Sequence, residues 1–448
     1  MNIDQLKIIY FVGIGGIGMS ALARYFKGLG TEVYGYDKTE TTLTKKLVEE
    51  GMQIHYDTDV MQIPQGVDLV VWTPAVPKEH AELQYFLKEG IPVKKRAEVL
   101  GIISKNRRCI AIGGTHGKTT TTSLLTHLLR TGGVDVSAFL GGIAQNFQSN
   151  FVQGKSDWVV VEADEYDRSF LQLYPEVAAI MSMDPDHLDI YGDADSVHDT
   201  GYLAFAKQVT GTLYVQNNWM QYFDKQVVRS FGVEGGEYCS ENLRVQDGYF
   251  VFDFKSPDFT LEGLRFPMPG RHNVENATAA IAIALQLGVT PESIPEGLLS
   301  FKGIKRRFEF IIRTEKTVFI DDYGHHPTEL KAAIGAAKQL FPNRKVTGIF
   351  QPHLYSRTRD FVDGFAEALD GLDEILLLDI YPAREQPIPG VTSDIIFEKM
   401  KSLNKRLVTK ADLLNELKNY DVEVLMTIGA GDIDTMVEPI REMLDDRH

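Results

Sequence analysis

The fold of this chain is decided by a stretch near its beginning, IIYFVGIGGIG at residues 8–18. Five apolar residues predict a buried β-strand, and the six that follow have the spacing G-x-G-x-x-G. An amphipathic stretch over residues 19–28 predicts a helix directly after the glycines. Glycines at these positions let backbone N–H groups and the helix N-terminus approach a diphosphate. The stretch therefore predicts a Rossmann-like domain with a nucleotide-binding loop.

A second strand, predicted over residues 32–36, ends at Asp37, which lies 19 residues beyond the last glycine of the loop. An acidic residue at this spacing suits contact with a ribose hydroxyl. The residues assigned to this first ligand site are Gly13, Gly15, Gly16, Gly18 and Asp37. Such a motif is common in NAD sites, so an NAD-dependent oxidoreductase is one interpretation, and a glycine turn needed only for packing is another.

Apolar runs of strand length alternate with helical periodicity in three successive blocks, which is typical of mainly parallel α/β domains. At roughly 150 residues per domain, a length of 448 residues also suggests about three domains. A polar segment at residues 104–108 is predicted to connect the first two. We therefore expect a Rossmann-like domain at 1–107, a P-loop ATPase-type α/β domain at 108–314 and a second Rossmann-like domain at 315–448.

Charge and cysteine content narrow the class of protein. With 46 Lys+Arg against 62 Asp+Glu, the formal charge is −16, which argues against a surface devoted to nucleic acid or anionic lipid. Cys109 and Cys239 lie far apart in the sequence, which speaks against a disulfide framework and fits a reducing compartment. No apolar run reaches the roughly 18 residues of a membrane span. We expect a cytoplasmic protein that binds neither nucleic acid nor membrane.

The second block opens with a different phosphate loop, GGTHGKT, directly after a predicted strand. Its backbone N–H groups can hold the phosphates of ATP, the Lys118 ammonium can neutralise their charge, and the Thr119 hydroxyl can bind Mg²⁺. The common P-loop pattern requires glycine where this chain has Ile112, so the loop is a variant. The residues assigned to ATP here are Gly113, Gly114, Thr115, His116, Gly117, Lys118 and Thr119. Hydride transfer needs no ATP, so this second loop favours a kinase-like or ligase-like reaction.

Two candidate metal ligands follow later strands of the same block. Glu162 comes directly after the predicted strand at residues 158–161, and His187 lies in an acidic segment beyond the strand at 178–181. Mg²⁺ prefers oxygen ligands, so Glu162 is the better candidate and His187 is the less expected one. For each acidic cluster the alternative is a solvated loop.

The chain resembles the Mur ligase family over nearly its whole length. The segments that carry the resemblance are residues 11–19, 113–119, 162–165, 186–189, 270–276, 306–308, 321–329, 351–353 and 381–385. The resemblance implies an N-terminal domain for a UDP-sugar, a central ATPase, and a C-terminal domain that closes over the site. Within the family, the chain is similar to the branch that joins L-alanine to UDP-N-acetylmuramate.

The resemblance also implies a reaction and its residues. ATP would phosphorylate the lactyl carboxylate of UDP-N-acetylmuramate, and L-alanine would then displace phosphate from the acyl phosphate. Thr119 and Glu162 are implied to hold one Mg²⁺, and His187 a second. Asp322 is implied to orient Arg307 or the incoming ammonium. The residues implied to be catalytic are Lys118, His187, Arg307 and Asp322.

Further residues are implied to bind the two nucleotides. Asn273 and Asn276 resemble positions that hold the adenine side of ATP. His353 and Arg357 resemble contacts to the anionic groups of the UDP-sugar, and an arginine fork suits a carboxylate or phosphate. Leu354 stands where the family often has arginine, which removes one cationic contact.

Two further interpretations remain beside this one and the oxidoreductase. A recycling ligase that attaches an intact tripeptide to UDP-N-acetylmuramate shares most of the same motifs. A nucleotide-sensing protein would bind UDP-sugar and ATP without catalysis. The presence of Lys118, Glu162, His187 and Asp322 argues against a sensor, which has no need of a complete transfer site.

Overall fold

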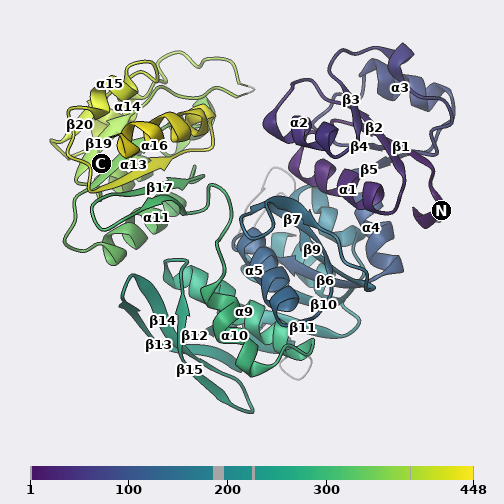
Figure 1. Ribbon diagram of the computed structural model, residues 1–448, viewed down its shortest axis with the longest axis horizontal. Coiled ribbons are helices and arrows are strands. Elements are labelled where there is room, and N and C mark those ends of the chain that lie inside the picture. The colour runs from purple at the N-terminus through teal and green to yellow at the C-terminus, as the bar shows by residue number, and fades with distance from the viewer. Residues whose placement is uncertain (1–2, 185–195, 225–227, 384, 447–448) are drawn as a thin grey trace. The chain divides into compact units, whose positions relative to one another are not determined.

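The structure is a computed structural model that describes residues 3–184, 196–224, 228–383 and 385–446 (Figure 1). The chain forms two compact units. The first comprises Met1–Asn242, Phe252–Leu264 and Glu275–Lys302. The second comprises Leu243–Val251, Arg265–Val274 and Gly303–His448. Each unit is built around parallel β-sheet covered by helices, as the alternating pattern predicts.

The first sheet has five parallel strands in the order β3-β2-β1-β4-β5. Its strands are β1 (Ile8–Val12), β2 (Glu32–Tyr36), β3 (Gln53–His55), β4 (Leu69–Trp72) and β5 (Val93–Lys95). Its helices are α1 (Ile17–Gly28), α2 (Thr42–Glu49), α3 (Ala81–Lys88) and α4 (Arg96–Asn106). The chain builds one side of the sheet from β1 to β3 and the other from β4 to β5. The glycine loop after β1 therefore lies at the switch point, where α/β sheets bind ligands.

Strand β1 is apolar throughout because both of its faces are covered. Ile9 and Phe11 belong to one hydrophobic cluster, which also includes residues of α1. Tyr10 and Val12 belong to a second cluster with Phe86 of α3. Successive side chains of a strand point to opposite faces, so a strand buried on both sides reads as a continuous apolar run.

The second sheet has ten strands in the order β15-β14-β13-β12-β11-β10-β6-β9-β7-β8. Its strands are β6 (Arg108–Gly113), β7 (Ser137–Ala144), β8 (Ser149–Val152), β9 (Trp158–Ala163), β10 (Pro175–Ile180), β11 (Thr212–Gln216), β12 (Val228–Val233), β13 (Tyr238–Gln246), β14 (Tyr249–Lys255) and β15 (Thr260–Phe266). The helices of this part of the chain are α5 (Lys118–Thr131), α8 (Leu203–Ala206), α9 (Arg271–Gln286) and α10 (Ile294–Leu299). Strand β6 runs parallel between β9 and β10. The loops that follow these three strands therefore meet at one edge.

The third sheet has six strands in the order β16-β17-β21-β18-β19-β20. They are β16 (Glu309–Arg313), β17 (Val318–Asp322), β18 (Val346–Phe350), β19 (Glu374–Leu377), β20 (Lys405–Leu407) and β21 (Val424–Ile428). All pairs are parallel except β16 with β17. The helices are α11 (Pro327–Leu340), α12 (Tyr355–Asp360), α13 (Val362–Leu369), α14 (Asp394–Lys399), α15 (Leu413–Leu417) and α16 (Val437–Asp445).

Short helical segments complete the connections between these elements. They are the 3-10 segments η1 (Ile3–Gln5), η2 (Val60–Gln62), η3 (Tyr166–Gln172), η5 (Asn217–Tyr222), η6 (Pro291–Ser293) and η7 (Asp432–Met436) and the π-helical η4 (Val197–Tyr202). Segment η3 follows β9, so it lies close to one of the predicted metal ligands in the sequence.

The predicted three-part α/β fold is confirmed, and two local expectations are wrong. The segment 104–108 is not a connector, because α4 continues to Asn106 and buries Ile103 completely. Residues 309–313, which the sequence places in the second block, form β16 at the edge of the third sheet. The predicted domain limits at 107/108 and 314/315 themselves stay a prediction.

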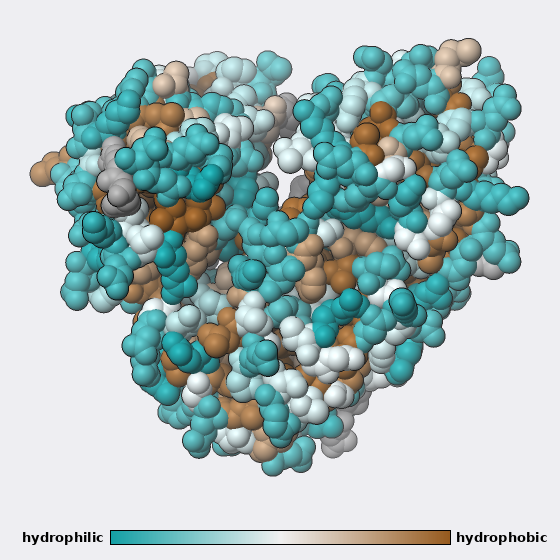
Figure 2. Space-filling model, in the orientation of Figure 1, coloured by the Kyte–Doolittle hydropathy of each residue, from teal (hydrophilic) through white to brown (hydrophobic). Residues whose placement is uncertain are grey.

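Polar residues cover much of the surface that Figure 2 shows, and the apolar residues on that face lie in small groups between them. In the described part of the chain, no helix has the length and apolarity that a membrane crossing requires.

We expect the Gly335→Ala variant to be more stable than the wild type by about 0.5–1 kcal/mol. Gly335 lies inside α11, and an added Cβ would meet no atom within 4 Å. An unfolded chain with alanine at this position has less conformational entropy than one with glycine, so less entropy is lost on folding. Urea denaturation of both proteins measures the difference. An equal or lower free energy of unfolding for the variant would contradict this expectation.

Candidate active site

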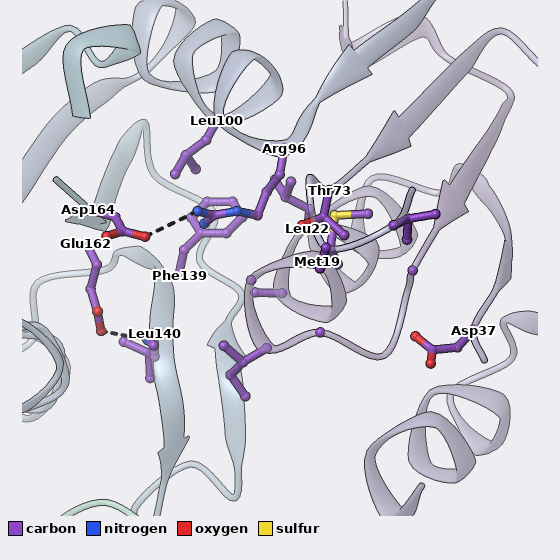
Figure 3. Close-up of a pocket in the computed structure, with 18 of the residues that line it drawn as sticks. Met19, Leu22, Asp37, Thr73, Arg96, Leu100, Phe139, Leu140, Glu162 and Asp164 are labelled. Atoms are coloured by element: carbon purple, nitrogen blue, oxygen red, sulfur yellow. Dashed lines mark hydrogen bonds and ion pairs between the residues drawn. The ribbon is translucent and has the colours of Figure 1, made fainter. Parts of the chain in front are cut away.

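The first unit contains a cavity of about 760 Å³ that joins the two predicted nucleotide loops (Figure 3). Its wall includes residues of the glycine loop, of the phosphate-loop helix and of the carboxyl end of β9. Those relevant to the reaction are Gly13, Gly16, Gly18, Asp37, Lys118 and Glu162. In Figure 3, Asp37 lies at one end of the view and Glu162 at the other. One ligand can therefore reach both loops.

The glycine loop is held against the end of β2. Gly13 N and Ile14 N both donate to Tyr36 O, at 2.8 and 3.0 Å. Gly15 N donates to Asp37 Oδ2 at 2.7 Å, so this carboxylate fixes the loop as well as lining the cavity. Contact between Asp37 and a ribose stays a prediction.

The phosphate loop is held against the chain segment after β10. Thr115 N donates to Ser182 O at 3.3 Å, and His116 N donates to Ser182 Oγ at 2.8 Å. The Thr115 hydroxyl donates to Asp184 O at 2.7 Å. These two loop amides are thus bonded within the protein in this conformation. Their predicted contact with phosphate would require an exchange of partners.

Lys118 is the first residue of α5, and its ammonium lies inside the phosphate loop. Its Nζ donates to Gly114 O at 2.6 Å and forms an ion pair with Glu165 Oε2 at 2.7 Å. The Glu165 carboxylate is buried, while the Lys118 side chain also lines the cavity. The structure thus holds a cation where an ATP phosphate is predicted to bind, and Glu165 positions it.

Thr119 and Glu162 come together as the sequence predicts for a Mg²⁺ site. The Thr119 hydroxyl donates to Glu162 Oε2 at 3.1 Å, and Gly141 N of β7 donates to Oε1 at 2.6 Å. Burial raises the pKa of Glu162, while Gly141, Lys118 and Thr119 oppose that shift. A hydroxyl and a carboxylate are oxygen donors of the kind that Mg²⁺ prefers, so these residues fit the ion. Among the described residues, no three His, Cys, Asp or Glu side chains form a metal-binding group.

Gly141 is required for this arrangement. A Cβ at this position would lie closer than 3.0 Å to both carboxyl oxygens of Glu162 and to their carbon. The strand that carries Gly141 must therefore have no side chain there if the carboxylate is to reach it.

The remaining ATP predictions have different outcomes. A Cβ at Gly117 would lie closer than 3.0 Å to Asn276 Oδ1, so Asn276 lies against the phosphate loop. Asn273 is buried, and its side-chain amide donates to Pro269 O at 2.7 Å. His187 lies outside the described residues, so its role as a metal ligand stays a prediction.

In the second unit, Asp322 lies at the carboxyl end of β17. Its carboxylate accepts hydrogen bonds from Phe308 N and Gly324 N, both at 2.8 Å. Burial raises the pKa of Asp322 to about 6, although the Arg307 charge and these two amides oppose the shift. The side chain is thus a buried acid that titrates close to neutral pH.

Charged and aromatic side chains gather beside Asp322. Arg307 Nη1 lies 3.8 Å from Glu329 Oε1, so its ion pair is with Glu329 of α11. His325 Nδ1 lies 3.4 Å from Glu329 Oε2. Burial alone would raise the pKa of Glu329, but His325, its amide hydrogen bonds and Arg307 hold it below the usual value. Burial also lowers the pKa of His325.

His353 and Arg357 lie next to each other, with Arg357 Nη1 3.3 Å from His353 Nδ1. The His353 ring stacks on Tyr381 and meets His325 edge to face, with centroids 5.9 and 6.3 Å apart. The second unit therefore brings His353 and Arg357 to the cluster around His325.

Four residues in these clusters received no role from the sequence. Glu165 and Glu329 lie within two of the motifs quoted above, and this was the sequence signal that could have identified them. The structure places them beside Lys118 and Arg307. Gly141 and Arg96 have no such signal, because each acts on a partner from a distant part of the chain. Arg96, at the start of α4, lines the same cavity and forms an ion pair with Asp164.

The pKa of Asp322 predicts a pH dependence of stability. A folded-state pKa of about 6 exceeds the usual value of 3.8, so the native state binds the proton more tightly than the unfolded state. Its stabilising effect is complete below about pH 4 and is lost as the pH rises through 6. We expect the free energy of unfolding of the wild type, relative to Asp322→Asn, to fall by about 3 kcal/mol over this range.

Urea denaturation of both proteins at intervals between about pH 4 and pH 7 tests this expectation. Asp360→Asn is the matched control, because Asp360 is exposed and its pKa is lowered by Arg359. A difference between wild type and Asp322→Asn that does not change with pH would contradict the assignment.

The geometry defines a class of enzyme. A lysine in a phosphate loop, with a hydroxyl and a carboxylate suited to Mg²⁺, is the arrangement of proteins that transfer a phosphoryl group. The same cavity reaches a second, diphosphate-type glycine loop. A phosphoryl-transfer enzyme with a nucleotide-linked second substrate accounts for both.

Comparison with known proteins identifies the family. Three family models match successive parts of the chain. The model described as "Mur ligase family, catalytic domain" matches residues 8–108, "Mur ligase middle domain" matches 112–284, and "Mur ligase, glutamate ligase domain" matches 306–431. The UDP-N-acetylmuramate–L-alanine ligase of Flavobacterium psychrophilum is 49% identical over 100% of both chains. The chain belongs to the Mur ligase family.

Solved structures agree with this assignment. The UDP-N-acetylmuramate-alanine ligase of Thermotoga maritima has a TM-score of 0.86 and 29% identity, covering 99% of this chain and 100% of its own. A murein peptide ligase of Psychrobacter arcticus has a TM-score of 0.69 and 22% identity, with 98% of each chain covered. The second likeness shows the shared fold.

Proposed function

We propose that this chain joins L-alanine to UDP-N-acetylmuramate with ATP, yielding UDP-N-acetylmuramoyl-L-alanine, ADP and phosphate for peptidoglycan precursor synthesis. One observation carries the proposal: a single cavity is lined by the glycine loop and by Lys118 and Glu162. The names of the relatives that match the chain over its whole length support the choice of substrates.

The reaction proceeds in two steps. The lactyl carboxylate attacks the γ-phosphorus of ATP, which forms an acyl phosphate and releases ADP. The amine of L-alanine then attacks the acyl carbon, and phosphate leaves as the amide forms and the amine loses its proton. Lys118 neutralises phosphate charge during the first step, and the cation needs Glu165 to hold it in place.

Mg²⁺ belongs to the proposed site as a partner of ATP, and when bound it offsets the charge of the phosphates. Thr119 and Glu162 are the described residues that would hold it. Gly141 keeps the Glu162 carboxylate turned toward Thr119. His187 as a ligand of a second ion remains part of the proposal.

The second unit contributes the residues for ligation in this proposal. Arg307 and Arg357 supply positive charge for the anionic intermediate, Glu329 orients Arg307, and His353 lies beside Arg357. Closure of the C-terminal domain over the site is a further part of the proposal. Small-angle scattering with and without substrates tests whether ligands make the molecule more compact.

An acceptor panel tests the proposed reaction. The protein is incubated with ATP, Mg²⁺, UDP-N-acetylmuramate and either L-alanine, glycine, L-serine or the intact tripeptide, and phosphate release is measured. Mass spectrometry identifies the product. We expect L-alanine to be the best acceptor. Efficient use of the tripeptide with L-alanine inert would identify a recycling ligase, and turnover of NADH would identify an oxidoreductase.

We also place this reaction in the cytoplasm, where ATP is supplied. Both cysteines, Cys109 and Cys239, are free and buried, which agrees with a reducing compartment. Fractionation of cells that produce the tagged protein tests this location.

A further inference from the structure

Arg96 lies in the cavity between the glycine loop and the predicted Mg²⁺ site. It is the first residue of α4, and its side chain lies along the last glycine of the loop. A Cβ at Gly18 would be 2.8 Å from Arg96 Nη1 and 3.0 Å from Cδ. The last glycine of the motif therefore makes room for this arginine. Figure 3 shows the guanidinium between the glycine-loop side of the cavity and Asp164.

The guanidinium also reaches the strand end that carries the Mg²⁺ carboxylate. Arg96 Nη2 lies 3.5 Å from Asp164 Oδ2, two residues beyond Glu162. Tight charge-assisted hydrogen bonds measure roughly 2.7–2.9 Å, so this ion pair is loose. The side chains of Arg96 and Asp164 are 28% and 38% exposed, which leaves both accessible from the cavity.

The positively charged side chains of the cavity differ in how tightly they are bonded within the protein. Among the described residues that line it, the positively charged ones are Lys38, Arg96 and Lys118. Lys38 is exposed, and Lys118 is bonded inside the phosphate loop. Arg96 is therefore the cation available to an anionic ligand that extends from the glycine loop toward Glu162. Its fork of N–H donors suits a phosphate or carboxylate.

We propose that Arg96 binds an oxyanion of the UDP-sugar, either its diphosphate or its carboxylate, and exchanges the loose ion pair with Asp164 for this contact. The inference rests on the proposed function, because it names a further residue for the same substrate. The exchange also ties substrate binding to Asp164 and hence to the strand end that carries Glu162.

Isothermal titration calorimetry with UDP-N-acetylmuramate and with UDP tests this proposal on the full-length protein. We expect Arg96→Ala to weaken UDP-N-acetylmuramate binding roughly 10–100-fold, the loss typical of a hydrogen bond to a charged group. Arg96→Lys should recover part of the affinity. An equal loss for UDP assigns the contact to the diphosphate, whereas unchanged UDP binding assigns it to the carboxylate.

Lys95→Ala is the matched control. Lys95 is the neighbouring cation and forms a similar ion pair with Asp167, at 3.1 Å, but it does not line the cavity. Its loss should leave UDP-sugar binding unchanged, and KM for ATP should stay at the wild-type value in the Arg96 variants. Unchanged affinity in Arg96→Ala, or an equal loss in Lys95→Ala, would overturn the inference. Because calorimetry needs no turnover, this result is separate from the acceptor panel that tests the proposed function.

Discussion

We expect the Lys118→Met variant to ligate about 10²–10³ times more slowly than the wild type, the cost of removing one group that stabilises transition-state charge. Methionine keeps most of the length of the side chain and removes only the ammonium. Binding of UDP-N-acetylmuramate should change little, because that substrate is predicted to bind mainly at the glycine loop. Phosphate release under saturating substrates measures the rate, and calorimetry measures the binding.

The variant needs a control for folding. Lys118 forms its ion pair with the buried carboxylate of Glu165, and breaking such a pair can destabilise a protein by about 3–5 kcal/mol. The double variant Lys118→Met/Glu165→Gln removes both charges together, so it should recover stability without recovering ligation. Ligation at the wild-type rate by a folded double variant would exclude the proposed role of the ammonium.

The second large effect concerns the proposed Mg²⁺ site. We expect Glu162→Gln to raise the Mg²⁺ concentration needed for half-maximal ligation by more than the roughly 10–100-fold typical of losing an outer-shell partner. Glutamine has nearly the same shape as glutamate. Its amide oxygen can still accept from Gly141 N, and the Thr119 hydroxyl can accept from its amide nitrogen. The effect is therefore that of the lost charge. A titration of phosphate release with Mg²⁺ measures it.

Gly141→Ala tests the same site without changing any ligand. The added Cβ would lie closer than 3.0 Å to the carboxyl atoms of Glu162 and would displace them. We expect this variant as well to need a higher Mg²⁺ concentration for half-maximal ligation. Gly335→Ala makes the same chemical change in open space and should ligate like the wild type. Normal Mg²⁺ dependence in both Glu162→Gln and Gly141→Ala would rule out this carboxylate as a ligand.

Much of the fold follows from local pattern. The strands at residues 8–12 and 32–36 were predicted with the bounds that the structure shows. These runs are apolar and end at loops, so short-range signals locate them. The end of α4 and the placement of β16 were missed. The polar residues at 104–108 resemble a connector, but they continue a helix whose Ile103 packs into the core. The sheet that β16 joins is decided by its pairing with β17, and the local sequence of β16 does not show that pairing.

For the candidate site as well, some residues could be predicted from the sequence and some contacts could not. The two glycine loops, Lys118, Thr119 and Glu162 follow from motif spacing, because each motif lies at the end of a predicted strand. The partner of Arg307 did not follow from the sequence. Asp322 is bonded to backbone amides, and the ion pair of Arg307 is with Glu329.

By itself, the sequence determined that this protein has three α/β domains and two glycine-rich loops that follow strands, and that it has the residue types of an ATP-dependent ligase. These features depend on neighbours within a few residues of each other, so they can be read along the chain. Only the tertiary structure decided that Gly141 makes room for Glu162, that Glu165 holds Lys118, and that Arg96 lies against Gly18 in the same cavity. The physical reason is that these contacts join strands and helices that are brought together by burial of a shared core, whose geometry no local pattern contains.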